Sequence, residues 1–349
     1  MARAICTQLQ SHGHKVSIFS GTLRDSEPLL SSSLDEGFVA VSPLCERFPL
    51  SSLWSWKLIP ELNRKIKEVD IVHIHFARDL IPITAAIICI FQKKKYVSQT
   101  HGMIVEDKRL ITKVLDKALV VYLLSKARIN FVLNEFEKLR IIRVTNKLRL
   151  KILQNGVSIP KTVTSTLPSS VLKVAFCSRL HPQKGIDKFL ELVESQKNEK
   201  VEFEVFGSDG GDLWKIDEYL QSENYNPKFF YRGVLKPNEV LGELSKLDIL
   251  VLPSFNENFP MIVLEALSVG ACVLVMPSCG IAKELSLFDK DFVSQSESTD
   301  GLIKTFERLK EKMPSMEKSS VIQFCQETFS VEKVCEGLED DYYGVLRSS

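Results

Sequence analysis

Short runs of apolar residues alternate along this chain with segments in which apolar residues recur at helical spacing. This alternation is typical of βα units, in which each buried strand of a parallel sheet is followed by a helix. Strands of the first half are predicted at 15–19, 71–75, 95–98, 129–133 and 148–152. Strands of the second half are predicted at 171–178, 201–207, 228–233, 248–253 and 271–276. The pattern therefore predicts an α/β protein.

One stretch divides the pattern in two. Residues 155–170, NGVSIPKTVTSTLPSS, contain glycine, two prolines and many Ser and Thr residues, a composition typical of an interdomain linker. We predict two Rossmann-like, doubly wound domains over 1–160 and 161–330, with a C-terminal helix (331–349) that packs back on the first domain. Because doubly wound sheets bind ligands at the carboxyl ends of their strands, the domains are expected to face a central cleft.

The start of the chain departs from this architecture. A doubly wound domain normally opens with a buried strand and a glycine-rich turn, whereas helical spacing here already covers 2–11. We therefore expect the first strand of the N-terminal domain to be missing and Met1 to be an internal methionine. An upstream in-frame strand would restore the domain; without one, two sheet edges would stay unpaired.

Composition restricts the class of protein. With 44% hydrophobic and 26% charged residues, the chain resembles an ordinary globular protein. Its longest apolar run, 81–91, contains a proline and is too short to span a bilayer. The eight cysteines are scattered without a C-x-x-C pair, which is typical of reduced thiols. Since no secretory leader opens the sequence, we expect a cytoplasmic protein.

Charge is distributed unevenly. Residues 1–165 hold 25 Lys and Arg against 14 Asp and Glu, whereas 166–349 hold 20 against 30. Without nucleic-acid motifs, the basic half suits an anionic partner such as a phosphorylated lipid or the inner face of a membrane, where the protein would bind peripherally. The triplet Lys93–Lys95 fits that interpretation. A merely solvated basic surface explains both observations as well.

Two carboxylates mark the segment 253–275, PSFNENFPMIVLEALSVGACVLV. Glu257 lies between a predicted strand and a helix that is expected to begin near Pro260 and to close at Gly270. Glu265 follows within that helix among Leu and Ala residues. Each carboxylate could accept hydrogen bonds from a vicinal diol, as sugars present, and backbone N–H groups at the helix start could bind an anion or hydroxyls. Acidic residues near a helix start are also common without function, which explains Glu257 better than Glu265.

Other clusters of ligand-type residues are weaker. His73 and His75 share one face of a predicted strand, but no third metal ligand is close in sequence. Asp289 and Asp291 follow no strand, and we interpret them as a solvated turn. Gly207, Gly210 and Gly211 do not form G-x-G-x-x-G. We therefore expect neither a metal nor a dinucleotide cofactor.

Taken together, the motifs resemble retaining glycosyltransferases of the GT-B fold, close to glycosyltransferase family 4. The segment 253–275 is similar to the family's E-x7-E segment, and FCSRLHPQKGID (176–187) is similar to G-R-L-x-x-x-K-G. VFGSDGGD, QTHGM and LQNGVSIP match further family segments in order. Three features depart from the family: the first strand is absent, Cys177-Ser178 replaces the usual small residue and glycine before the Arg, and PSCGIAKE has a single glycine where the family often has two.

The resemblance implies a role for each matching residue. Arg179 and Lys184 would neutralise the donor diphosphate without a metal, and Glu265 would hold the ribose. The transferred sugar would be surrounded by Glu257 and by the backbone of Asn258, Phe259, Pro260 and Met261, although Pro260 has no N–H to donate. Gly207 would belong to the donor-binding residues as well. From the first, acceptor-side domain, His101 would contact the sugar or assist the acceptor. The catalytic residues would thus be Glu257, His101, Arg179 and Lys184.

The implied function is transfer of a sugar from a nucleotide sugar to a saccharide, or to a saccharide on a polyprenyl-diphosphate lipid, in surface polysaccharide biosynthesis. The second domain would bind the nucleotide sugar, and no other cofactor is implied. Two alternatives stay open: a sugar-nucleotide epimerase of the same fold, and a truncated, inactive sugar-nucleotide-binding protein. The sequence names neither the sugar, the base, the linkage nor the oligomeric state.

Overall fold

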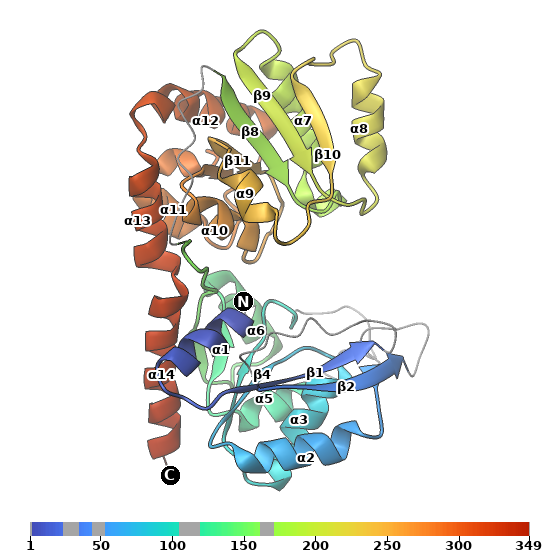
Figure 1. The fold of residues 1–349 in the computed structure, drawn as a ribbon, viewed down its shortest axis with the longest axis vertical. Coiled ribbons are helices and arrows are strands. Elements are labelled where there is room, and N and C mark those ends of the chain that lie inside the picture. The colour runs from blue at the N-terminus through green and yellow to red at the C-terminus, as the bar shows by residue number, and fades with distance from the viewer. Residues whose placement is uncertain (1, 24–34, 44–52, 105–118, 161–170, 349) are drawn as a thin grey trace. The chain divides into compact units, whose positions relative to one another are not determined.

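The computed structural model describes residues 2–23, 35–43, 53–104, 119–160 and 171–348. The chain divides into two compact units (Figure 1). The first unit contains Met1–Asn155 and Val331–Ser349, and the second contains Gly156–Ser330. Each unit contains a parallel sheet together with helices, which confirms the predicted α/β class. Of the predicted linker, 161–170 lies outside the described residues.

The strands of the first unit form two sheets within the described ranges. They are β1 (Ser17–Leu23), β2 (Asp35–Pro43), β3 (Leu53–Trp54), β4 (Val72–His75), β5 (Tyr96–Gln99), β6 (Asn130–Val132) and β7 (Leu150–Ile152). One sheet has the order β1-β2-β3 and the other β4-β5-β6-β7. The sequence analysis missed β2, because glycine, proline and acidic residues are poor strand formers. A parallel ladder with β1 nevertheless holds it in place.

Helices cover the second of these sheets on both faces. They are α1 (Ala2–Ser11), α2 (Leu58–Glu68), α3 (Leu80–Phe91), α5 (Val121–Lys126), α6 (Glu135–Val144) and α14 (Val331–Arg347). Neighbouring residues of one strand belong to different cores: Tyr96 packs with residues of α2, α3 and α5, whereas Val97 packs with residues of α1 and α14. This is the result of side chains alternating between the faces of a strand.

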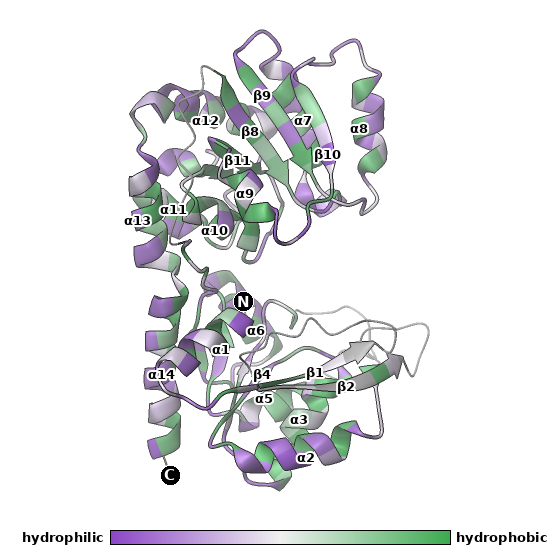
Figure 2. Cartoon of the chain, in the orientation of Figure 1, coloured by the Kyte–Doolittle hydropathy of each residue, from purple (hydrophilic) through white to green (hydrophobic). Residues whose placement is uncertain are grey.

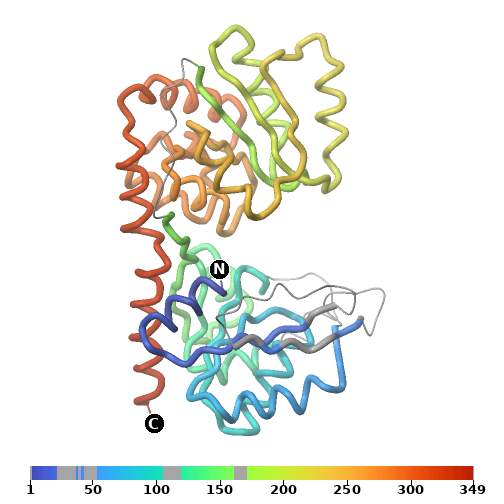
Figure 3. Tube along the Cα trace, in the orientation of Figure 1, coloured from blue at the N-terminus to red at the C-terminus, as the bar shows by residue number. Residues whose placement is uncertain are grey.

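The two ends of the sequence meet in the first unit. Figure 3 shows α1 in blue and α14 in red side by side. Ile5 and Leu9 of α1 pack against Val334 and Leu338 of α14 in one buried cluster. Apolar residues spaced by three or four positions account for this contact, because they form one face of each helix. The helix predicted near the C-terminus thus packs on the first unit.

The second unit has a single five-stranded parallel sheet in the order β10-β9-β8-β11-β12. Its strands are β8 (Leu172–Cys177), β9 (Val201–Phe206), β10 (Phe229–Gly233), β11 (Ile249–Leu252) and β12 (Cys272–Val275). Its helices are α7 (Ile186–Ser195), α8 (Leu213–Leu220), α9 (Val240–Leu244), α10 (Met261–Ser268), α11 (Ala282–Phe288), α12 (Thr299–Lys312) and α13 (Lys318–Phe329), with short 3-10 turns η2 (Pro182–Lys184), η3 (Lys290–Phe292) and η4 (Met313–Ser315). All five strands were predicted to within two residues.

Hydropathy explains why these strands were easy to predict. Every residue of β11 and β12 is buried, as expected of strands with helices on both faces. Figure 2 shows the hydrophobic colour on β11 and mixed colours along α14. No helix in the described part of the chain is long and apolar enough to cross a bilayer.

The strand order places a ligand position in the second unit. Strand β8 lies between β9 and β11, so the chain leaves β8 toward one side of the sheet and later returns on its other side. At such a switch point the loops after the two neighbouring strands diverge and leave a crevice at their carboxyl ends. The loops after β8 and β11 contain three of the predicted site residues, Arg179, Lys184 and Glu257.

Candidate functional site

Lys184 and Glu257 form an ion pair in the second unit. Nζ of Lys184 lies 2.5 Å from Oε2 of Glu257, and the side chains are 22% and 16% exposed. Lys184 follows β8 and Glu257 follows β11, so residues 73 positions apart meet at the switch point. The backbone joins the same two loops, since Phe255 N donates to Gln183 O at 2.9 Å. The structure therefore brings together two of the predicted site residues.

Glycine permits the close approach of these loops. Gly185, next to Lys184, has φ +72°, and a Cβ there would lie 2.3 Å from the carbonyl oxygen of Pro253. Gly207, after β9, leaves no room either: its Cβ would lie 1.9 Å from Ser178 O. A side chain at either position would displace the loop that carries Lys184 or Arg179. Gly207 thus shapes the predicted site through its backbone.

The loop after β12 forms hydrogen bonds with the loop that carries Glu257. Gly280 N donates to Glu257 O at 2.8 Å, and Asn256 N donates to the hydroxyl of Ser278 at 3.0 Å. Asn256 adopts φ +52°, a left-handed conformation that asparagine tolerates better than most residues. Three loops, after β8, β11 and β12, therefore fix the position of the Glu257 carboxylate.

Helix α10 begins at Met261, directly after this loop, with Pro260 as its N-cap. Pro260 has no side chain that could cap the first amides, and amides of a first helical turn have no partner within their helix. The ring of Phe259 is buried and packs edge-on against the ring of Phe329, with 6.3 Å between the ring centroids. Only the backbone of Phe259 can therefore serve a ligand. Gly270 follows α10 with φ +84°, which confirms the predicted helix end.

Glu265 projects from the second turn of α10. Its neighbours Leu264 and Ala266 are fully buried, while Glu265 itself is partly exposed. Burial raises the pKa of the Glu265 carboxyl above its usual value. Burial, and to a lesser degree the Glu265 carboxylate, raises the pKa of the Cys177 thiol to about 12. Because Cys177 ends β8, Glu265 also lies near the switch point.

Arg179 lies just past the end of β8 and is exposed. Its aliphatic stem packs on Gly210, where a Cβ would come within 2.9 Å of Arg179 Cγ. Beyond the end of β8, an isolated parallel bridge joins Leu180 to Asp209. This bridge anchors the residue directly after Arg179. The guanidinium therefore belongs to the same loop as Lys184, at the same edge of the sheet.

His101, the predicted site residue of the first unit, lies in a row of three imidazoles. Nε2 of His101 is 2.6 Å from Nδ1 of His75, and their rings stack at 4.9 Å. The His75 ring stacks in turn on His73 at 5.0 Å, and Nδ1 of His73 lies 2.6 Å from the Tyr342 hydroxyl. No third residue of this kind lies close to His73 and His75 in the sequence, but the pairing of β4 with β5 brings His101 beside them.

Burial keeps this row uncharged. Desolvation, followed by the proximity of His101, lowers the pKa of His75 to about 4, and desolvation lowers that of His101 to about 4. The pKa of the more deeply buried His73 falls well below its usual value for the same main reason. Although His75 as a residue keeps solvent exposure, its ring has another imidazole on each face. A neutral imidazole has one donor and one acceptor nitrogen, so the tautomers of His75 and His101 decide which of the two donates in their 2.6 Å contact.

Sequence reasoning missed three supporting residues. Glu137 is 1% exposed and binds the turn that contains His101. Ser254, 1% exposed at the end of β11, has a hydroxyl without a hydrogen-bond partner among the described residues. Ser278 binds the Glu257 loop. A polar residue directly after a buried strand was the available signal for Ser254; Glu137 gave none, because a Glu in a first helical turn is ordinary.

Within the described ranges, no group of three or more His, Cys, Asp or Glu residues has a geometry that could hold a metal ion. The interpretation of Asp289 and Asp291 as a solvated turn was wrong for Asp291. Its carboxylate is buried and pairs with Arg308 at 2.8 Å and Lys312 at 2.6 Å. Both cations come from α12, so this pair is a structural tie between η3 and α12.

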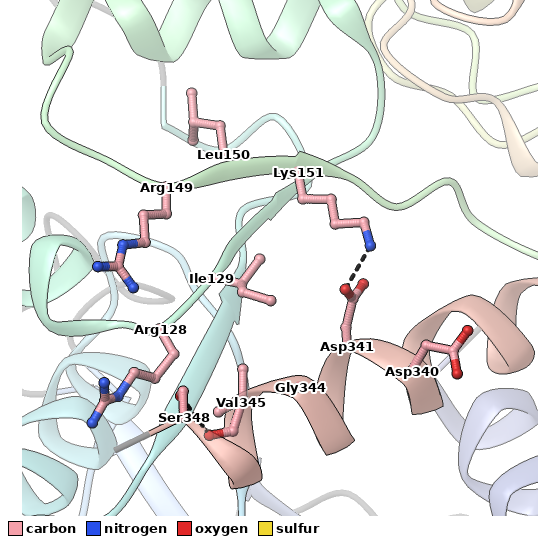
Figure 4. Close-up of a pocket in the computed structure, with 10 residues that line it drawn as sticks. All are labelled: Arg128, Ile129, Arg149, Leu150, Lys151, Asp340, Asp341, Gly344, Val345 and Ser348. Carbon is pink, nitrogen blue, oxygen red and sulfur yellow. Dashed lines mark hydrogen bonds and ion pairs between the residues drawn. The ribbon is translucent and has the colours of Figure 1, made fainter.

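A separate concavity of about 340 Å³ lies at the amino ends of β6 and β7 (Figure 4). It combines Arg128 and Arg149, whose side chains extend to the same side in Figure 4, with the ion pair of Lys151 and Asp341 at 2.5 Å. Ligands of doubly wound sheets bind at the carboxyl ends. We therefore do not include this concavity in the site.

Comparisons with known proteins identify the family of the chain. The model of "Glycosyl transferases group 1" matches residues 163–320, and that of "Glycosyltransferase Family 4" matches residues 1–160. The chain belongs to the GT-B glycosyltransferases. The first model covers the unit with Lys184 and Glu257, and the second covers the chain around His101.

Three known proteins are similar to this chain. An uncharacterized 41.2 kDa protein in the cps region of Klebsiella pneumoniae is 23% identical over 64% of this chain and 65% of its own length. Alpha-galactosylglucosyldiacylglycerol synthase of Streptococcus pneumoniae is 29% identical over 29% of this chain and 28% of its own length. The structure of Anabaena Alr3699/HepE in complex with UDP has a TM-score of 0.77 at 13% identity, over 99% of this chain and 96% of that one. This GT-B chain thus spans less than two thirds of the length of both curated relatives.

Proposed function

We propose that this protein is a retaining, metal-independent hexosyltransferase that moves a sugar from a nucleotide sugar to a saccharide or lipid-linked saccharide. The ion pair between Lys184 and Glu257 carries the proposal. It places a cation and a carboxylate side by side at the switch point of a doubly wound sheet, with Arg179 on the same loop. A nucleotide sugar presents this combination of chemistry: a diphosphate beside a polyol.

Each residue has a distinct role in the proposed reaction. The cations of Arg179 and Lys184 stabilise negative charge on the diphosphate as the glycosidic bond breaks. Glu265 accepts hydrogen bonds from the ribose hydroxyls, and Glu257 accepts them from the sugar. Backbone amides at the start of α10 add donors for the sugar hydroxyls. His101 contacts the sugar or the acceptor from the first unit.

Retention of configuration would proceed with help from the leaving phosphate. An oxygen of the diphosphate accepts the proton of the attacking acceptor hydroxyl on the face from which it departs, while the bond from the sugar to the diphosphate breaks. Among the described residues, the carboxylate bound to the His101 turn is Glu137, which is buried and accepts hydrogen bonds from Thr100, Gly102 and Leu133, so it is not positioned to attack the sugar. This favours phosphate assistance over a covalent intermediate.

The acceptor is proposed from charge and from relatives. The first unit has the basic excess, which suits a diphosphate-linked lipid at the inner face of the cell membrane. A relative in the cps region and a diacylglycerol glycosyltransferase are consistent with surface polysaccharide biosynthesis and a lipid acceptor. The Anabaena complex with UDP supports a uridine nucleotide as the first donor to test.

A panel of nucleotide sugars tests the proposal. Thermal shift and saturation-transfer measurements with UDP-, GDP-, ADP- and dTDP-sugars should identify one nucleotide that stabilises the protein. Incubation with that donor and a polyprenyl-diphosphate saccharide should then release the nucleoside diphosphate together with a lengthened acceptor. In this product the transferred sugar should keep the anomeric configuration that it had in the donor. Formation of a free epimerised sugar nucleotide without acceptor would indicate the epimerase instead. Binding without any product would indicate an inactive binding protein.

A further inference from the structure

The side chain of Glu137 joins the first turn of α6 to the turn that carries His101. Its Oε1 atom accepts hydrogen bonds from the Thr100 hydroxyl and from Gly102 N, each at 2.5 Å. Its Oε2 atom accepts from Leu133 N at 2.7 Å. One carboxylate therefore binds both residues that flank His101, and it does so in a fully buried position.

Helix α6 holds this carboxylate in place. Asn134, the N-cap of α6, accepts a hydrogen bond from Glu137 N at 2.9 Å, and Asn134 is itself buried. The arrangement is a variant of the capping box, in which the acidic third residue of a helix reaches back to the residues before it. Here the carboxylate also extends beyond its own helix to Thr100 and Gly102.

The turn requires such support because of its backbone conformation. His101 has φ +48° and Gly102 has φ +75°, and a left-handed conformation is unfavourable for histidine. The adjoining backbone is anchored on both sides: Thr100 N donates to Phe131 O at 3.2 Å, and Met103 N donates to Thr100 O at 2.8 Å. Unfavourable backbone conformations persist where the surroundings impose them, and they concentrate at functional sites.

The ring of His101 is fixed from a second direction. It stacks on His75 at 4.9 Å with an interplanar angle of 13°, and the 2.6 Å contact joins Nε2 of His101 to Nδ1 of His75. The nitrogen that remains for a ligand is Nδ1. Its direction depends on the backbone turn, and the turn is bound by Glu137.

We propose that Glu137 is a positioning residue that sets the pose of the His101 imidazole. The carboxylate acts through the Thr100–Gly102 turn and does not itself touch the substrate. The proposal rests on the proposed function only in that His101 then meets the sugar or the acceptor. If Glu137 were merely a cap of α6, its loss would lower stability without moving the His101 ring.

The substitution Glu137→Gln tests this difference. Three donors face the two carboxylate oxygens, so either orientation of the amide places an NH₂ group against a donor. We expect a change in the ring nitrogen resonances of His101, assigned by comparison with His101→Gln, because the hydrogen bond to His75 is altered. We also expect kcat to fall about 10- to 100-fold with donor binding unchanged. Glu135→Gln, an exposed change on the same helix, is the matched control and should leave both readouts unaffected.

A second pair of variants applies if Glu137→Gln does not fold. Thr100→Val removes one donor to the carboxylate, whereas Thr100→Ser keeps the hydroxyl. The valine variant should change the His101 ring signals and lower kcat, and the serine variant should preserve both. Unchanged ring signals in Glu137→Gln or in Thr100→Val would overturn the proposal. Changed ring signals with full activity would support the positioning by Glu137 and reject the role of His101 in the proposed reaction.

Discussion

Lys184 Nζ lies 2.5 Å from Glu257 Oε2, although the two residues follow different strands, β8 and β11, of the sheet in the second unit. Both side chains are mostly shielded from solvent, so each neutralises the other where water screens them poorly. A ligand with both a phosphate and hydroxyl groups could bind the two partners at once. The order of the strands, in which β8 and β11 are neighbours, therefore brings together the two groups that the proposed donor requires.

Substitutions of the two partners should have different effects. We expect Lys184→Ala to weaken nucleotide binding about 10- to 100-fold, since a charge-assisted hydrogen bond contributes about 1.5–3 kcal/mol. We expect Glu257→Ala to keep nucleotide binding within a few-fold and to lower kcat by roughly 100-fold, because its partner is the transferred sugar. Calorimetry and initial rates measure both quantities.

The control for this pair is Glu243→Ala, which removes a Lys–Glu pair of similar length on α9. An exposed ion pair contributes little, so this variant should behave as the wild type. Full turnover by Glu257→Ala would remove the basis of the proposed function.

Glu265→Gln should stabilise the unliganded protein and weaken its binding of the nucleotide. Burial raises the pKa of Glu265 in the folded state above its usual 4.5, so the folded state binds a proton more readily than the unfolded chain. The free energy of unfolding therefore falls as the pH rises above about 4.5. Removing the charge should raise the melting temperature at pH 7 but not near pH 4. Loss of a charged acceptor should also weaken nucleotide binding by roughly 5- to 30-fold.

Thermal denaturation at both pH values, with and without nucleotide, tests the prediction for Glu265. Glu191→Gln, an exposed change on α7, serves as the comparison. An equal melting temperature for Glu265→Gln and the wild type at pH 7 would contradict the burial argument.

The row of imidazoles should make the first unit sensitive to acid. The pKa values of His75 and His101 are about 4 in the folded state, against about 6.5 in an unfolded chain. Below pH 6.5 the unfolded chain therefore binds more protons, and the free energy of unfolding should fall as the pH drops from 6.5 through 4. Above pH 6.5 this contribution is fully present.

Urea unfolding at pH 7, 6 and 5 measures this dependence. His75→Gln should reduce the slope of stability against pH, because it removes one low-pKa group and a neighbour that lowers the pKa of His73. His181→Gln in the second unit is the control. A slope that His75→Gln leaves unchanged would show that other groups govern acid unfolding.

Gly185→Ala should destabilise the second unit. The substitution would place a methyl group 2.3 Å from Pro253 O in a left-handed conformation, and such a conformation alone costs about 1–3 kcal/mol. The loop with Lys184 would move away from Glu257, so nucleotide binding should weaken together with the melting temperature. Gly242→Ala on α9, where a Cβ meets no atom within 4 Å, should be neutral or stabilising by up to about 1 kcal/mol. Equal melting temperatures for the two variants would contradict this account.

Local sequence was enough to predict the strands of the second unit. Apolar runs such as 249–252 and 272–275 are buried on both faces, so their composition alone identifies them. The same holds for α10, since Pro260 and Gly270 mark its ends. Strand β2 was missed because its ladder with β1, and not its residue preferences, determines it.

Sequence by itself also predicted the residue types of the candidate site: Arg179, Lys184, Glu257, Glu265 and His101 each come from a local motif. Only the tertiary structure decided which of them meet. The contact between Lys184 and Glu257 follows from the pairing of β8 with β11, and the row of His73, His75 and His101 follows from the pairing of β4 with β5. The role of Glu137 was invisible in the sequence, because its hydrogen bonds reach a turn 35 residues away. Short-range preferences fix local elements, whereas strand order and buried hydrogen bonds between distant segments fix the site.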